Sequence, residues 1–175
     1  LYHPTTYLGA GDVDYATGTR DLTYATELGY KYIETFMPDV LLNDGDVLNI
    51  GGIEFTFMHT PGHTEGCMSF FFNIDGDRGI QRVGTFGGAG LNSLTTEYLE
   101  RHGLPYSLRE DFMASIEKAD KMHVDIHMGN HVDNNKMFDK LKKMETEGGN
   151  PFIDPDDFHA FLNRVRVTYQ KTFSE

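Results

Sequence analysis

The chain is poor in cysteine, in basic residues and in long apolar segments. Its single cysteine excludes an intramolecular disulfide, so no oxidising compartment is implied. Fifteen basic residues against 27 acidic ones give a net charge of -12, which argues against a nucleic-acid partner because this charge repels phosphate. The apolar runs are too short for a membrane span or a signal-peptide core. The sequence therefore predicts no membrane partner and leaves the compartment open, exported or cytoplasmic.

What is present suffices for one folded domain over residues 1–175. The chain is 39% apolar and 13% aromatic, enough to build a core. A domain of about 150 residues buries roughly 70% of the surface that its unfolded chain exposes. Because the chain begins at Leu1 without an initiator methionine, we expect it to be a processed protein or a piece of a longer one.

Turn residues separate short apolar runs in the first half of the chain. Two glycines between Val47–Ile50 and Ile53–His59 predict a hairpin. Further strands are expected at 67–74 and 81–86, joined by an Asp-Gly-Asp turn. A short helix at 24–28, ended by a glycine, is the one element that the weakly patterned first forty residues suggest.

The second half of the chain alternates helical and strand patterns. Apolar residues spaced along 108–119 predict a helix, residues 124–128 a short buried strand, and residues 136–144 a helix with its basic side chains exposed. A final helix has Asp154 as its N-cap, Pro155 at its first position and acidic residues in its first turn. Its predicted apolar stripe consists of Phe158, Phe161, Leu162, Val165 and Tyr169. The predicted class is mixed α/β (α+β).

Two histidines follow predicted strands at tight turns. His63 comes after a Pro-Gly pair that cannot continue a sheet, so its imidazole stands at a rigid strand end, where a metal ligand or catalytic base is well held. An isolated turn histidine more often caps nearby backbone. His131 follows the strand at 124–128 and a glycine in the same way. Alternation in that strand turns Asp125 and His127 away from its apolar residues, which favours a structural or outer role for His127. No such context surrounds His3, His102 or His159.

Four segments together resemble the metallo-β-lactamase superfamily. Residues 59–66, HTPGHTEG, are similar to its third metal-binding motif, in which the strand-end histidine binds zinc. Residues 85–92 fall where most members carry a Gly-Asp pair whose carboxylate bridges two metals, but Gly88 occupies that place. Subclass B3 also lacks this carboxylate. Residues 124–131 and 150–155 resemble the B3 segments that supply the last histidine ligand and open the final helix.

The resemblance implies an αββα sandwich of which this chain holds the C-terminal portion. It lacks the superfamily's His-x-His-x-Asp-His loop, which provides most of both metal sites, and the first strands. The implied zinc ligands are His63 and His131, and two ligands are too few for tight binding. We therefore expect the chain to be inactive alone, with sheet edges and apolar faces that self-association could cover.

In the intact family member, the resemblance implies two zinc ions and a hydroxide that attacks an amide or ester carbonyl of a small-molecule substrate. Asp125 and His127 are candidates for orienting the ligands, and Asn92 or Ser93 for contacting substrate. Cys67, at the start of an apolar strand, is expected to pack in the core.

Two other functions stay open. One is a non-catalytic scaffold or fragment of the same fold, and the other is a mononuclear metal-binding module that uses His63, His131 and one further group such as His127. Whether the substrate is a β-lactam is undecided, because the fold also serves lactonases, thioesterases and nucleases. The missing bridging carboxylate counts against the thioesterase and nuclease branches.

Overall fold

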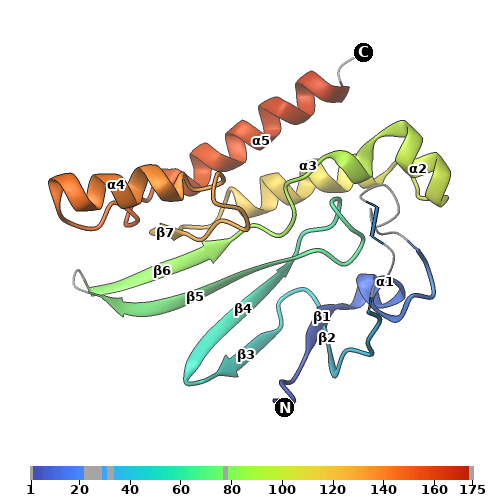
Figure 1. The fold of residues 1–175 in the computed structure, drawn as a ribbon, viewed down its shortest axis with the longest axis horizontal. Coiled ribbons are helices and arrows are strands. Elements are labelled where there is room, and N and C mark those ends of the chain that lie inside the picture. The colour runs from blue at the N-terminus through green and yellow to red at the C-terminus, as the bar shows by residue number, and fades with distance from the viewer. Residues whose placement is uncertain (1, 22–28, 31–33, 77–78, 174–175) are drawn as a thin grey trace.

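A five-stranded sheet, a two-stranded sheet and a layer of helices make up the molecule (Figure 1). The computed structural model describes residues 2–21, 29–30, 34–76 and 79–173. The small sheet pairs β1 (Tyr7–Gly9) in parallel with β2 (Val40–Leu42). The strands of the large sheet, in spatial order, are β3 (Val47–Ile50), β4 (Ile53–His59), β5 (Met68–Gly76), β6 (Gly79–Thr85) and β7 (Ile126–His127).

Helices α2 to α5 lie on one face of the large sheet, and the short α1 lies beside the small sheet (Figure 1). The helical elements are η1 (Ala10–Asp12), α1 (Val13–Thr17), η2 (Asn92–Leu94), α2 (Thr96–His102), α3 (Leu108–Ala119), α4 (Met137–Glu147) and α5 (Asp157–Phe173). The predicted mixed α/β class is confirmed. Among the described residues, no helix has the length and apolar character that crossing a membrane requires.

The predicted hairpin is confirmed, with β3 antiparallel to β4. Its two turn residues, Gly51 and Gly52, have φ angles of 62° and 89°, which glycine adopts without a steric penalty. Strands β5 and β6 match the predicted pair but extend further toward each other, because Asp75 and Gly76 continue the ladder. The rest of that predicted turn, and the helix expected at 24–28, lie outside the described residues.

The core lies between the large sheet and the helices. Phe71 of β5 is fully buried there and meets the ring of Phe158 of α5 edge to face, with centroids 6.2 Å apart. The predicted apolar face of α3 is buried at all four positions, Leu108, Phe112, Ile116 and Ala119. Four of the five predicted stripe residues of α5 are buried, and Tyr169 packs against the cluster half-buried.

The predicted boundaries and surfaces of α4 and α5 were partly wrong. Helix α5 begins at Asp157 rather than at Pro155, and Asp154 caps only the preceding turn. Asp157 is not an exposed first-turn charge, because its carboxylate accepts a hydrogen bond from Lys140 of α4 at 2.8 Å. Both side chains are at least nine-tenths buried, so the expectation that the basic residues of α4 are exposed fails at Lys140. A buried charge is tolerated here because it is paired.

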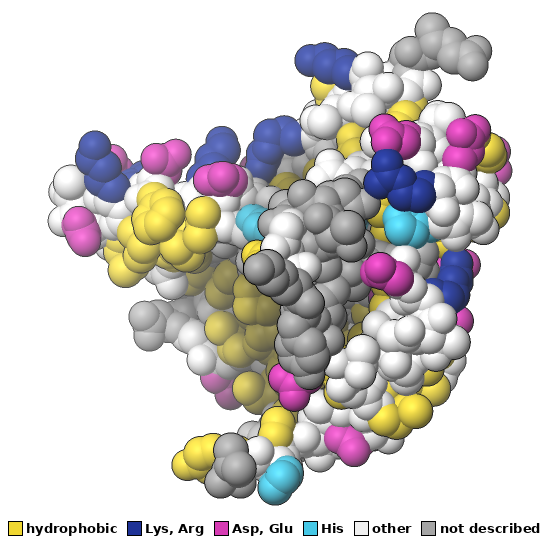
Figure 2. All heavy atoms as spheres, turned by 45° about the vertical axis from the view of Figure 1, so that its right-hand side comes forward, with side chains coloured by type: hydrophobic (Ala, Val, Ile, Leu, Met, Phe, Trp, Pro, Cys, Tyr) yellow, Lys and Arg dark blue, Asp and Glu magenta, His cyan; other side chains and the backbone are white. Residues whose placement is uncertain are grey.

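The opposite face of the large sheet carries an aromatic cluster. Because side chains alternate along a strand, Phe55 and Phe57 of β4 and Phe70 and Phe72 of β5 point away from the helices. Neighbouring rings among these four have centroids 4.6 to 6.5 Å apart. Figure 2 shows hydrophobic side chains lining a hollow below the helix layer.

Candidate metal centre

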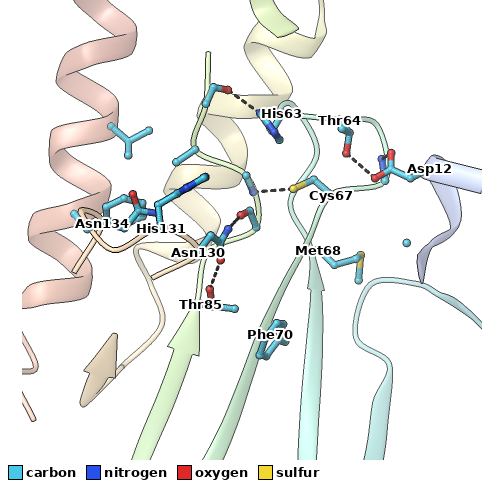
Figure 3. Close-up of a pocket in the computed structure, with 18 of the residues that line it drawn as sticks. Asp12, His63, Thr64, Cys67, Met68, Phe70, Thr85, Asn130, His131 and Asn134 are labelled. Atoms are coloured by element: carbon cyan, nitrogen blue, oxygen red, sulfur yellow. Dashed lines mark hydrogen bonds between the residues drawn. The ribbon is translucent and has the colours of Figure 1, made fainter. Parts of the chain in front are cut away.

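Both predicted ligand histidines line one cavity of about 910 Å³ at the ends of β4, β5 and β6. His63 enters it from the turn between β4 and β5, and His131 from the loop after β7 (Figure 3). A third segment, the loop 86–91 after β6, contributes backbone to the lining. Sequence positions far apart are therefore brought to one place, as the strand-end pattern predicted for these two residues.

The turn that carries His63 is fixed by its neighbours. Gly62 has a φ of 133°, and a Cβ there would lie 2.5 Å from the Cα of Phe112 in α3, so glycine is required. The hydroxyl of Ser115 donates to the carbonyl of Pro61 at 2.7 Å. The hydroxyl of Ser93 donates to the carbonyl of His63 itself at 2.6 Å. The backbone at His63 is thus held from two sides.

The ring of His63 is also oriented. Its Nδ1 lies 2.8 Å from the carbonyl oxygen of Gly90, and a carbonyl can only accept, so Nδ1 carries the proton. The lone pair is then on Nε2, which is the nitrogen available to a metal or a proton. One side of the ring packs on Gly88, where a Cβ would approach Cδ2 to 2.1 Å.

Asp12 forms hydrogen bonds to the turn that carries His63. This residue was not identified from the sequence. Its carboxylate accepts hydrogen bonds from the Thr64 hydroxyl at 2.6 Å and from the Gly66 amide at 2.7 Å. Burial raises the pKa of Asp12, an effect that these two hydrogen bonds oppose. The Gly-Asp pair directly after a short apolar segment was the one local signal, since such a pair suits a strand-end turn.

Two backbone amides of the loop after β6 donate hydrogen bonds to side chains near the start of β5. The Gly87 amide donates to the Ser69 hydroxyl at 2.9 Å, and the Gly88 amide donates to the sulfur of Cys67 at 2.8 Å. Cys67 is buried, as predicted. Burial raises the pKa of its thiol to about 11, so the sulfur of the metal-free protein is protonated at neutral pH and is not an activated nucleophile.

His131 is exposed at the rim of the cavity. The residue before it, Asn130, binds back to the loop after β6: its Nδ2 donates to the carbonyls of Phe86, at 2.9 Å, and of Gly87. Its Oδ1 accepts from the Thr85 hydroxyl at 2.8 Å. The His131 loop is therefore attached to the same segment that supports the ring of His63.

His127 lies outside this cavity. The strand expected at 124–128 is only two residues long, and His127 points from it into the core below α5. Its ring is 1% exposed, packs on Phe161 with centroids 4.7 Å apart, and places Nδ1 3.2 Å from the Asp157 carboxylate. The alternation predicted for this strand is wrong, because His127 faces the core while Met128 is 39% exposed. His127 is therefore not placed to be the third ligand of a mononuclear module with His63 and His131.

The remaining predicted residues take different places. Asp125 accepts from the Arg82 amide at 2.8 Å and contacts His123, so it ties β6 to the segment before β7 and contacts neither predicted ligand. Asn92 lines the cavity, where it could meet a substrate. Ser93 uses its hydroxyl on the backbone of His63 instead. Across the described ranges, no three His, Cys, Asp or Glu side chains gather where they could hold a metal ion.

Comparison with known proteins defines the fold. No family model matches. The subclass B3 metallo-β-lactamase BJP-1 of Bradyrhizobium japonicum superimposes with a TM-score of 0.79 at 22% identity, over 96% of this chain and 62% of that enzyme. The FEZ-1 metallo-β-lactamase of Legionella gormanii gives 0.78 at 24% identity, over 97% and 66%. The chain has the metallo-β-lactamase fold. The fold predicted from the four motifs is thereby confirmed.

A curated protein is similar to about half of the chain. The acyl-coenzyme A thioesterase MBLAC2 of Homo sapiens is 31% identical over 88 residues, which are 49% of this chain and 27% of that protein. The chain thus spans less than two thirds of each of these three proteins, as expected for an incomplete αββα sandwich.

Proposed function

We propose that this chain supplies His63 and His131 to the metal centre of a zinc-dependent hydrolase that cleaves an amide or ester carbonyl of a small molecule. The observation that carries the proposal is the orientation of His63. Its Nδ1 proton is committed to the Gly90 carbonyl, so Nε2 presents its lone pair, the arrangement found in most metal-binding histidines. Because His131 lines the same cavity, a second imidazole can serve that centre.

The residues fit part of a zinc site. Zinc takes imidazole nitrogen readily, but it usually needs three protein ligands in a catalytic site and four in a structural one. His63 and His131 supply two, and the described residues place no third ligand with them. We therefore propose that further ligands are needed for tight binding and that the chain is inactive by itself. When bound, zinc would lower the pKa of its water to about 7 and polarise the carbonyl.

The other residues of the site act by positioning. The Gly90 carbonyl and the Ser93 hydroxyl orient His63, and the neutral thiol of Cys67 supports the Gly88 amide. Gly88 offers no carboxylate to bridge two metals, so this position contributes to the cavity only through its backbone, which packs against His63. Asn92 is the polar side chain that we propose for substrate contact.

The substrate is proposed to be a small molecule because the cavity, about 910 Å³, is within the range of about 300–1,000 Å³ typical of small-molecule sites. The similar B3 enzyme is a β-lactamase and the similar human protein an acyl-coenzyme A thioesterase. Both names are consistent with a hydrolysis in which a nucleophile attacks an activated carbonyl. The absent carboxylate at Gly88 favours the B3-like reaction over the thioesterase.

A non-catalytic scaffold with this fold is the alternative. The lack of a third metal-binding side chain among the described residues is the observation that favours it. Under this alternative His63 and His131 would have no common ligand, so metal binding separates the two functions.

Metal titration tests the proposal. Zinc and cobalt(II) are titrated calorimetrically into metal-free protein, and the wild type is compared with His63→Ala, His131→Ala and the exposed control His3→Ala. We expect weak binding that both site variants abolish and the control retains, and little zinc after dialysis. Binding that neither site variant weakens would overturn the ligand assignment, and zinc retained tightly through dialysis would contradict the incomplete ligand set.

A further inference from the structure

We infer that Asn130 is the positioning residue that fixes His131 relative to His63, by tying the His131 loop to the glycine-rich loop on which the ring of His63 rests. The inference deepens the proposed function in that it takes the two histidines as ligands of one centre. It is carried by the geometry of one side chain and the loop that it binds.

The loop 87–90 has the sequence Gly-Gly-Ala-Gly, so it has almost no side chains with which to hold a shape. Glycine loses more conformational freedom on folding than other residues, and such a loop depends on bonds from outside. Gly87 and Gly88 obtain two of them at their amides, from Ser69 and Cys67. Both of these partners belong to the β5 side of the site.

Asn130 supplies the bonds at the carbonyls. A primary amide has two N–H donors, and the Nδ2 group of Asn130 uses them on Phe86 and Gly87. Because the two carbonyls can only accept, the end of the amide that faces them carries the nitrogen, and the Thr85 hydroxyl donates to the other end, Oδ1, at 2.8 Å. The side chain is therefore a three-point staple between the end of β6 and the residue before His131 (Figure 3).

The staple reaches both histidines. Asn130 is the peptide neighbour of His131, so its side-chain bonds set where that backbone leaves β7. At the other end, the stapled loop continues to Gly88, whose backbone packs against the ring of His63, and to Gly90, whose carbonyl accepts the hydrogen bond from His63 Nδ1. Loss of the staple is expected to loosen His131 directly and His63 through this loop. A residue that merely formed a turn would affect His131 alone.

The test compares four variants in metal-free protein. Asn130→Ala removes the staple, and Asn130→Asp keeps its shape but turns a carboxylate oxygen toward two carbonyl oxygens. Thr85→Val removes only the hydrogen bond to Oδ1, and it is the milder variant if the other two fail to fold. Asn134→Ala is the matched control, since this asparagine lines the same cavity and its side chain makes no hydrogen bond to the described part of the chain. Circular dichroism checks that each is folded.

The first measurement is NMR of ¹⁵N-labelled histidine rings, with the His63 signal assigned from His63→Ala. We expect the hydrogen-bonded Nδ1 proton of His63 to be visible in the wild type and in Asn134→Ala. It should be lost in Asn130→Ala and Asn130→Asp, and weakened in Thr85→Val. An unchanged His63 signal in the folded Asn130 variants would overturn the inference, because the loop would then hold its own shape.

The second measurement is the zinc titration of the same proteins. Removal of an orienting partner typically lowers metal affinity about 10- to 100-fold, and we expect a decrease of that size in Asn130→Ala but not in Asn134→Ala. If the wild type binds no zinc through the two histidines, the proposed function fails while the NMR result still decides the role of Asn130. Zinc affinity equal to the wild type in Asn130→Ala would count against the inference.

Discussion

The ring of His63 lies against the backbone of Gly88 so closely that no side chain fits between them. A Cβ built on Gly88 would come within 2.1 Å of Cδ2, and one on Gly90 within 3.1 Å of Cε1. The position at which the sequence resemblance leads one to expect a bridging carboxylate is therefore closed here by the imidazole itself. A carboxylate at residue 88 and the present orientation of His63 exclude each other.

Gly88→Ala should consequently displace His63. We expect zinc affinity to fall and the free energy of unfolding to drop by about 1–3 kcal/mol, the usual effect of overpacking. Gly90→Ala, whose added methyl is about 1 Å less crowded, is the graded control and should have a smaller effect on both quantities. Calorimetric zinc titration and urea denaturation measure them. Equal effects of the two substitutions would contradict the contact with the His63 ring as the cause.

Asp12 should control the order of the turn that bears His63. Asp12→Ala removes the acceptor of the Gly66 amide, so the hydrogen exchange of that amide should become faster while amides of β5 keep their protection. Asp14→Ala, a loss of the same charge two residues away in α1, is the control. Exchange of the Gly66 amide at the wild-type rate in Asp12→Ala would show that the turn does not depend on this carboxylate.

Cys67 should be unreactive in the native protein. Because burial raises the pKa of its thiol to about 11, the thiolate fraction near pH 8 is about one in a thousand, and access is poor as well. We expect iodoacetamide to label Cys67 only as the protein unfolds in urea, with mass spectrometry following the reaction. Rapid labelling in native buffer would refute the assignment of a buried neutral thiol.

The position of His63 could be predicted from the sequence because its causes are local. A proline and a glycine after an apolar strand force a turn, and the turn exposes one imidazole. The direction of the ring could not be predicted in the same way, since Gly90, its partner, lies 27 residues further along the chain. The hydrogen bond from Thr64 to Asp12 joins residues that are 52 positions apart in the sequence. No rule of periodicity or spacing predicts such a pair.

The pairing of Lys140 with Asp157 shows the same limit. Each residue taken alone has the pattern of a solvated surface charge, one on an amphipathic helix and the other in a first helical turn. Their burial follows from the packing of α4 beside the start of α5, which brings the two charges together at 2.8 Å. Residues whose role is set by a partner far along the chain were therefore the ones that sequence reasoning missed.

Asp157 should make folding stability depend on pH in the acid range. Burial by itself would raise the pKa of its carboxyl, but the hydrogen bonds from His127 and Lys140, with the charge of Lys140, outweigh burial and lower that pKa from 3.8 to about 2. Because the folded pKa is below the unfolded one, the native state binds fewer protons. Its stabilising contribution, about 2 kcal/mol, is full above roughly pH 4 and is lost as the pH falls through about 2.

Asp157→Asn should flatten this part of the stability profile. At neutral pH the variant should lose about 2–4 kcal/mol, because Lys140 is left with a buried charge and no partner. Urea denaturation from pH 7 down to about pH 3 measures both effects, with Asp156→Asn, an exposed neighbour in the sequence, as the control. A variant as stable as the wild type at pH 7 would mean that Lys140 reaches solvent once unpaired, and that the pair does not hold α4 against α5.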